Sequence, residues 1–75
     1  MKKDPNKLYL IHGLRGKLWF CETDSQIYLG NGAAKTFETK KDAREFMKTK
    51  DFKFLDKLIP CEWHITTIEE WDKIF

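Results

Sequence analysis

The segment "GNGAAKT", from Gly30 to Thr36, contains the residue types of a phosphate-binding loop. In the Walker A motif, GxxxxGK[ST], glycines let backbone amides surround the phosphates and a helix begins at the lysine. Here alanine stands directly before Lys35, and the helical pattern begins only after Thr39. The segment is therefore predicted to be a turn that leads into a capped helix, and no nucleotide or other cofactor is expected.

The histidines and cysteines are the other candidates for chemistry: His12, Cys21, Cys61 and His64. The chain has no CxxC pair of the kind that structural zinc sites use. Cys61 and His64 are three residues apart on a predicted strand, which places them on opposite faces. We expect no metal site, two reduced and buried thiols, and no catalytic residues or enzymatic activity.

Length and composition favour a small binding protein. The chain of 75 residues has a net charge of +2 and a high aromatic share, with three Trp, six Phe and two Tyr. A domain of this size buries only about 60% of its unfolded surface, so one sheet and one or two helices are expected. We predict a flexible leader at residues 1–7 and a single domain at residues 8–75. No apolar run is long enough to cross a membrane, so a cytoplasmic location is expected.

The first half of the chain predicts three strands. Leu8–Ile11 and Leu18–Cys21 are apolar runs around "HGLRGK", which indicates a β-hairpin. Gln26–Leu29 is a third short strand, and Asn31-Gly32 is a turn signal.

The second half predicts the helices and a fourth strand. Thr39 caps a helix that ends near Thr49, and residues 51–59 favour a loose helical turn. Cys61–Thr66 alternates like a strand, and Thr67 with Glu70 forms a capping box before an apolar stripe of Ile68, Trp71 and Phe75. The predicted fold class is α+β, with a small antiparallel sheet of three to four strands packed on one main helix and a short C-terminal helix.

The hairpin is apolar on both faces. If Gly13–Gly16 is its loop, residues 8, 10 and 12 lie opposite residues 21, 19 and 17, and one face carries Leu8, Leu10, Trp19 and Cys21, with His12 and Lys17 at its edge. The main helix can cover one face, and the C-terminal helix, a second copy of the chain or another partner must cover the other. Tryptophan beside basic residues is typical of interface anchors. The predicted partner-binding residues are His12, Arg15, Lys17 and Trp19.

A basic line on the main helix supports an alternative. Lys41, Arg44 and Lys48 have helical spacing and could follow a phosphate backbone. Glu45 interrupts this line, as in an ordinary solvated helix face.

Two resemblances give these surfaces a biological form. The segment "AKTFETKKDAREF", Ala34 to Phe46, resembles the Phe-x-Thr-x-x-x-Ala segment of small phage-encoded proteins of β-β-α-β type. That resemblance implies a protein that binds a host enzyme or defence complex. With the preceding "KLYLIHGLRGKLW", the segment also resembles the N-terminal hybrid-binding domain of ribonuclease H, although "ETDSQIYLGNG" stands where that family has a Trp-containing helix. This second resemblance implies that Tyr9, Arg15 and Lys17 lie in a nucleic-acid-binding strand region.

The sequence therefore leads to one main hypothesis and two alternatives. The main hypothesis is a small inhibitor from a phage or mobile element that binds a host protein and blocks it by occupying space. The first alternative is a module that binds a nucleic-acid duplex or RNA/DNA hybrid through Tyr9, Arg15, Lys17, Lys41, Arg44 and Lys48. The second is a purely structural homodimer.

Overall fold

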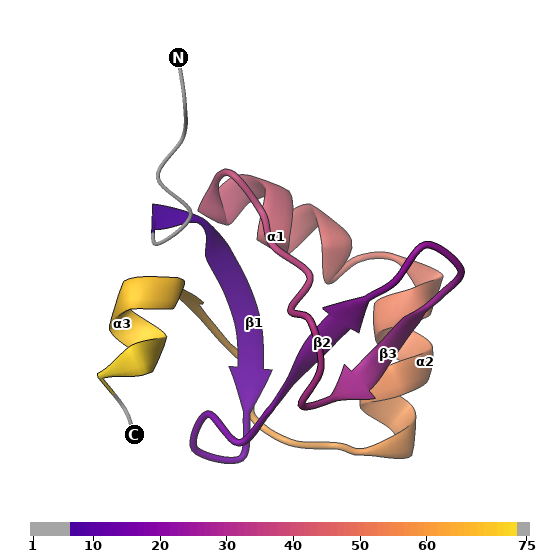
Figure 1. The fold of residues 1–75 in the computed structure, drawn as a ribbon. Helices are drawn as coiled ribbons and strands as arrows, with labels where there is room; N and C mark the ends of the chain where they lie inside the picture. Colours follow the sequence, from indigo (N-terminus) through magenta and orange to yellow (C-terminus); the bar gives the residue numbers. More distant parts are fainter. Residues whose placement is uncertain (1–6, 74–75) are drawn as a thin grey trace.

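The computed structural model describes residues 7–73, which form a four-stranded antiparallel sheet with three helices. In chain order the elements are β1 (Tyr9–Gly13), β2 (Leu18–Glu22), β3 (Ile27–Gly30), α1 (Lys40–Phe46), α2 (Lys50–Leu58), β4 (His64–Thr67) and α3 (Ile68–Asp72). The strands lie in the order β3-β2-β1-β4 (Figure 1). The predicted α+β class and strand number are confirmed. The predicted leader, apart from Lys7, and Phe75 of the predicted apolar stripe lie outside the described residues.

The predicted register of the first hairpin is wrong by two residues. His12 pairs with Trp19 and Gly13 with Leu18, so the loop starts after Gly13 and not at it. Gly13 is buried, and a Cβ atom built on it would lie 2.5 Å from the Cys61 sulfur. The glycine therefore serves the close approach of the chain before β4, which the sequence pattern did not reveal. A shift of two residues leaves every side chain on its predicted face.

The segment between β3 and α1 lies between β1 and β2 at the end where these strands diverge. Its backbone pairs Ala34 with Cys21 of β2 and Phe37 with Tyr9 of β1. The Lys35 amide donates to the Phe20 carbonyl at 2.8 Å. This insertion explains why the β1–β2 ladder is short, and Figure 1 shows the segment rising between the two strands.

Threonine caps begin all three helices. The hydroxyl of Thr39 accepts from the Asp42 amide, that of Thr49 from the Phe52 amide and that of Thr67 from the Glu70 amide. The predicted caps at Thr39 and Thr67 are thus confirmed. The region that the sequence left as a loose turn forms α2, so two helices take the place expected for one. No helix within residues 7–73 has both the length and the apolar character that a membrane span requires.

The helices cover opposite faces of the sheet. Phe20 of β2 contacts Phe46 of α1 and Phe52 of α2, with ring centroids 5.4 and 5.1 Å apart. The neighbouring Trp19 points to the other face, where its ring lies 4.9 Å from that of Trp71 in α3. The core cluster occupies the first face and consists of Ile11, Phe20, Phe37, Ala43, Phe46 and Phe52. The sequence allowed the second face to be covered by the C-terminal helix, by a second copy of the chain or by another partner. In the structure α3 covers it.

Candidate functional site

The loop between β1 and β2 has a left-handed backbone. Leu14 and Arg15 have φ angles of 51° and 59°, and Gly16 has a φ of 81°. The Gly16 amide donates to the Gly13 carbonyl at 3.1 Å, and the Lys17 amide donates to the Leu14 carbonyl at 3.2 Å. Leu14 and Arg15 are the non-glycine residues with positive φ within residues 7–73. Each such residue costs about 1–2 kcal/mol, so contacts elsewhere must hold the loop.

Three distant elements supply those contacts. The indole nitrogen of Trp71 in α3 donates to the Gly16 carbonyl at 2.9 Å. The Asn31 side chain, which follows β3, donates to the Lys17 carbonyl. The Leu14 amide lies against the thiol of Cys61, whose pKa is raised by burial and by the Asp56 charge and lowered by this amide. The loop is therefore held at Leu14, Gly16 and Lys17, on either side of Arg15.

The tip exposes an apolar side chain between two cations. Leu14 is 52% exposed, and Arg15 and Lys17 are both exposed. A leucine this exposed at a strained position does not contribute to the core of the domain. We name Leu14, Arg15 and Lys17 the hairpin tip.

The structure separates the four residues predicted to bind a partner. Arg15 and Lys17 lie at the hairpin tip, whereas Trp19 is half-buried and its indole nitrogen donates to the Gly32 carbonyl at 2.9 Å. His12 is only 3% exposed, so it does not lie where a polar rim would lie. The prediction that this region binds a partner stays a prediction, and its exposed part is the hairpin tip.

His12 has an unusual environment for a buried residue. Its Nε2 atom shares a hydrogen bond with the Thr66 hydroxyl at 3.0 Å, while Nδ1 has no hydrogen-bond partner within the described chain. Its ring centroid lies 5.7 Å from that of His64. Burial lowers the pKa of His12, and the nearby His64 lowers it further. His12 is thus a poorly satisfied interior group beside His64 and Thr66 of the neighbouring strand β4.

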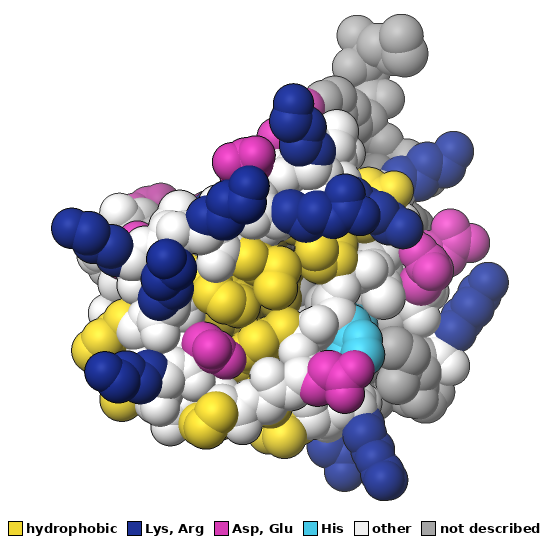
Figure 2. Space-filling view, turned by 180° about the vertical axis from the view of Figure 1, so that it is seen from behind, with side chains coloured by type: hydrophobic (Ala, Val, Ile, Leu, Met, Phe, Trp, Pro, Cys, Tyr) yellow, Lys and Arg dark blue, Asp and Glu magenta, His cyan; other side chains and the backbone are white. Residues whose placement is uncertain are grey.

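The residues of the nucleic-acid alternative lie at two ends of the sheet. Lys41 and Arg44 are exposed on α1, which lies toward the start of β1, whereas Arg15 and Lys17 follow its end (Figure 1). Lys48 is exposed in the turn after α1, so the basic line predicted along the helix does not extend to it. The sixth, Tyr9, is half-buried, and its backbone pairs with that of Phe37. On the face seen from behind, Lys and Arg side chains lie above and to the left of a central hydrophobic area, and Asp or Glu side chains and a histidine lie below it (Figure 2). The exposed cations of this alternative therefore do not form one continuous basic surface.

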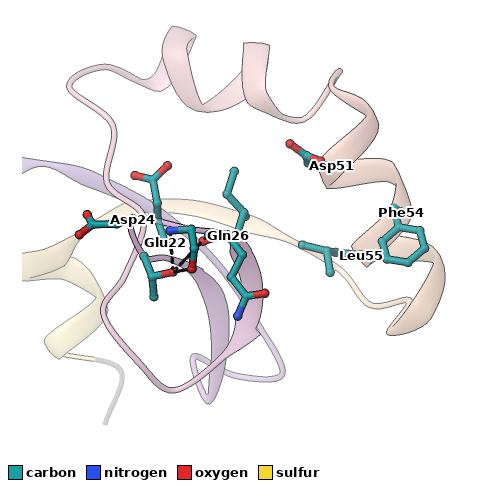
Figure 3. Close-up of a pocket in the computed structure, with 9 residues that line it drawn as sticks. Glu22, Asp24, Gln26, Asp51, Phe54 and Leu55 are labelled. Atoms are coloured by element: carbon teal, nitrogen blue, oxygen red, sulfur yellow. Dashed lines mark hydrogen bonds between the residues drawn. The ribbon is translucent and has the colours of Figure 1, made fainter.

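A second surface, which sequence reasoning missed, lies along α2. Phe54 and Leu58 are each 62% exposed, and Ile59 after the helix is 39% exposed. Beside them is a hollow between α2 and the β2–β3 turn, into which Asp51 and Leu55 point while Phe54 points outward (Figure 3). Glu22 and Asp24 line its other wall. The signal was present in the sequence as a second apolar pair at helical spacing, opposite Phe52.

Neither surface carries a recognisable reactive group. Within residues 7–73 no three His, Cys, Asp or Glu side chains are placed to hold a metal ion. Cys21 is buried and Cys61 is half-buried, and both are free thiols. Comparison with known protein families, with curated proteins and with solved structures found no match.

Proposed function

We propose that the protein acts by binding a protein partner and that the hairpin tip is the contact. The left-handed conformation of Leu14 and Arg15 is the observation that supports this most directly. Turns of this handedness favour Asn-Gly, which adopts positive φ with little strain. Strained backbone that the surrounding structure holds in place is concentrated at binding and active sites. A leucine that is both strained and 52% exposed is explained by contact with a partner.

The side chains of the tip define the partner surface. Leu14 requires an apolar pocket, while Arg15 and Lys17 require an acidic rim around it. The bonds from Trp71 and Asn31 hold the loop before binding, so little conformational entropy is lost when the complex forms. The tip is therefore suited to insertion into a cleft of a larger protein.

The resemblance of residues 34–46 to small phage-encoded proteins supports a biological setting. In this setting the protein is a small inhibitor from a phage or mobile element, and its target is a host enzyme or defence complex in the cytoplasm. Inhibition by a tip of this kind needs no chemical step, because occupying a cleft is enough to exclude a substrate or subunit.

Nucleic-acid binding is the second candidate, and the exposed cations of α1 and of the turn after it favour it. Lys41, Arg44 and Lys48 are all exposed, although Lys48 also lies 3.9 Å from Glu45. Each phosphate contact would add roughly 0.7–0.9 to the slope of log affinity against log salt. The two candidates therefore use different elements and respond differently to nuclease and salt.

A loop variant separates binding from folding. Replacing Leu14→Asn and Arg15→Gly together supplies the residues that the turn favours, so the melting temperature should rise, with stability gained by about 1–3 kcal/mol. The same variant should lose the partner, because the apolar anchor and one cation are gone. The measurement is a pull-down with the tagged full chain from host lysate, with and without nuclease treatment, alongside a thermal melt.

The matched control removes charge from α1. The variant Lys41→Ala/Arg44→Ala should retain the protein captured by the unmodified chain. Capture by the loop variant but not by the α1 variant, or capture that nuclease abolishes, would overturn the proposal in favour of the nucleic-acid candidate. A loop variant that melts earlier would show that Leu14 stabilises the fold, and the conformational argument for a binding role would be lost.

A further inference from the structure

The outward side of α2 carries an apolar ridge. Phe54 and Leu58 are one turn apart, and each is 62% exposed. Phe52, which is 7% exposed, anchors the same helix to the core on its opposite side. The helix is thus apolar on both sides, and the described chain covers only one of them.

The two flanks of this ridge carry opposite charges. At about 100° per residue, Lys50 and Lys57 lie roughly 60–80° to one side of the ridge, and Asp51 lies roughly 40° to the other. The acidic flank continues across the hollow of Figure 3 to Glu22 and Asp24. Glu22 also pairs with Lys35 at 2.9 Å, so Asp24 and Asp51 are the carboxylates that face the hollow without a charged partner in the described chain.

We propose that this face of α2 is a homodimer interface, with a second copy of the chain as its occupant. A surface with an apolar centre, a basic flank and an acidic flank can be complementary to itself. The homodimer uses α2 alone, and it does not depend on partner binding by the hairpin tip.

The charges also select the arrangement of the two copies. A twofold axis parallel to α2 sets the two helices side by side in the same direction and brings the basic flank of each against the acidic flank of the other. An antiparallel pair would instead place basic flank against basic flank. The parallel arrangement brings Phe54 and Leu58 against their own counterparts, with Lys50 near Asp51 and the hollow of the second copy.

The size of the surface sets the expected strength. Nine helical residues span about 13 Å, which is short of the area that a standard stable interface buries. The dimer should therefore be weak and concentration-dependent, with a dissociation constant in the range of about 10–500 µM. Ion pairs of this kind should also make it weaker at high salt.

Sedimentation equilibrium of the full chain tests the interface between about 10 µM and about 1 mM, a range that brackets the expected affinity. The unmodified chain should pass from monomer to dimer. Leu58→Glu should remain monomeric across this range, while its circular dichroism spectrum and melting temperature stay close to those of the unmodified chain. Leu14→Glu, which adds the same charge at an exposed leucine outside α2, should dimerise normally. A chain that stays monomeric throughout, or dimers unaffected by Leu58→Glu, would overturn the proposal.

A charge exchange tests the parallel arrangement. Lys50→Glu and Asp51→Lys should each weaken the dimer about tenfold or less, as expected for exposed pairs. Combining them restores opposite charges across the axis and should recover most of the loss. Two single variants that weaken the dimer without recovery in the double variant would exclude the parallel pairing of Lys50 with Asp51.

Discussion

The two faces of the sheet are built by different means. The face toward α1 and α2 is closed by an aromatic cluster in which Phe20 contacts Phe46, Phe52 and Trp63. The face toward α3 is closed by a helix of five residues, with Trp71 against Trp19. His12 is buried near this second face with one ring nitrogen lacking a partner in the described chain. Stability is therefore concentrated on the first face.

This difference also relates to the candidate binding surface. The loop that carries the hairpin tip accepts a hydrogen bond at Gly16 from Trp71, which belongs to the weaker face. The conformation in which the tip is held before binding therefore depends in part on the less strongly packed helix. The contrast between the faces can be tested directly, by variants that remove a group from each.

The largest effect should come from Phe20→Ala. Phe20 is fully buried, with 0% exposure, and its replacement leaves a cavity among aromatic rings. We expect a loss of about 3–5 kcal/mol, which is most of the stability of so small a domain. Phe54→Ala, at a residue 62% exposed, is the control and should change the unfolding free energy by less than about 0.5 kcal/mol. Urea unfolding of both variants gives the comparison, and similar losses would contradict the assignment of the core to this face.

Trp19→Ala should produce a smaller loss, of about 2–3 kcal/mol, because Trp19 is only half-buried. Its ring packs on Trp71, and its indole nitrogen bonds the Gly32 carbonyl. Trp19→Phe keeps the ring contact but removes that hydrogen bond, so about 1 kcal/mol should be lost.

A thermal melt of Trp19→Ala decides between the two roles that the sequence leaves open for Trp19, a core residue or an anchor for a partner. A core residue lowers the melting temperature when truncated, whereas an exposed anchor for a partner leaves the melt unchanged. The packing against Trp71 leads us to expect the first outcome. An unchanged melt for Trp19→Ala would instead return Trp19 to the binding surface and show that α3 contributes little to its face.

The local signals in the sequence predicted the elements well, because each depends on nearby residues. Thr39 and the pair Thr67 and Glu70 cap helices as expected, since a cap needs only a hydroxyl and an amide a few residues away. The alternation of side chains along the two hairpin strands also predicted which of them lie on the same face of the sheet. These signals fixed which side chains share a face but not which residues pair.

Long-range contacts account for what could not be predicted. The register depends on Gly13, whose lack of a side chain makes room for Cys61 and Trp63 from a distant segment. The insertion of residues 34–37 between β1 and β2 has no local signal either. The burial of His12 follows from its contact with Thr66, which lies 54 residues away in the sequence. Such contacts decided which predicted site residues reach the surface.

Acidification should weaken the face that contains His12. Burial lowers the pKa of His12 below its ordinary value of 6.5, so the unfolded chain binds this proton more readily than the folded chain. Stability is therefore fully present above pH 6.5 and falls as the pH drops from there toward the lowered pKa, by at most about 1.4 kcal/mol per pH unit.

Urea unfolding at a series of pH values between about 5 and 8 measures this slope. His12→Gln cannot titrate and should flatten the profile in the region near pH 6, where carboxyl groups contribute little. His64→Gln is the matched control, because His64 is exposed and should leave most of the slope in place. A profile that stays steep in His12→Gln would assign the pH dependence to another group.

The smallest effects should come from the helix caps, and they distinguish the faces most finely. Thr39→Ala and Thr67→Ala each remove the hydroxyl that accepts a hydrogen bond at 3.1 Å from a backbone amide, that of Asp42 or Glu70, which is worth about 1 kcal/mol in a helix that unfolds only with the whole domain. Thr67→Ala also removes the bond that this hydroxyl donates to the Glu70 carboxylate at 3.0 Å. For α1, whose Ala43 and Phe46 are buried, that condition should hold, and Thr39→Ala should lower the global unfolding free energy by this amount. Helix α3 has five residues and none that is fully buried, so it cannot remain helical once detached. Thr67→Ala should therefore increase hydrogen exchange at the amides of Trp71 and Asp72 while the amides of β2 keep their protection. Equal protection losses in β2 for both variants would show that the two faces unfold as one cooperative unit.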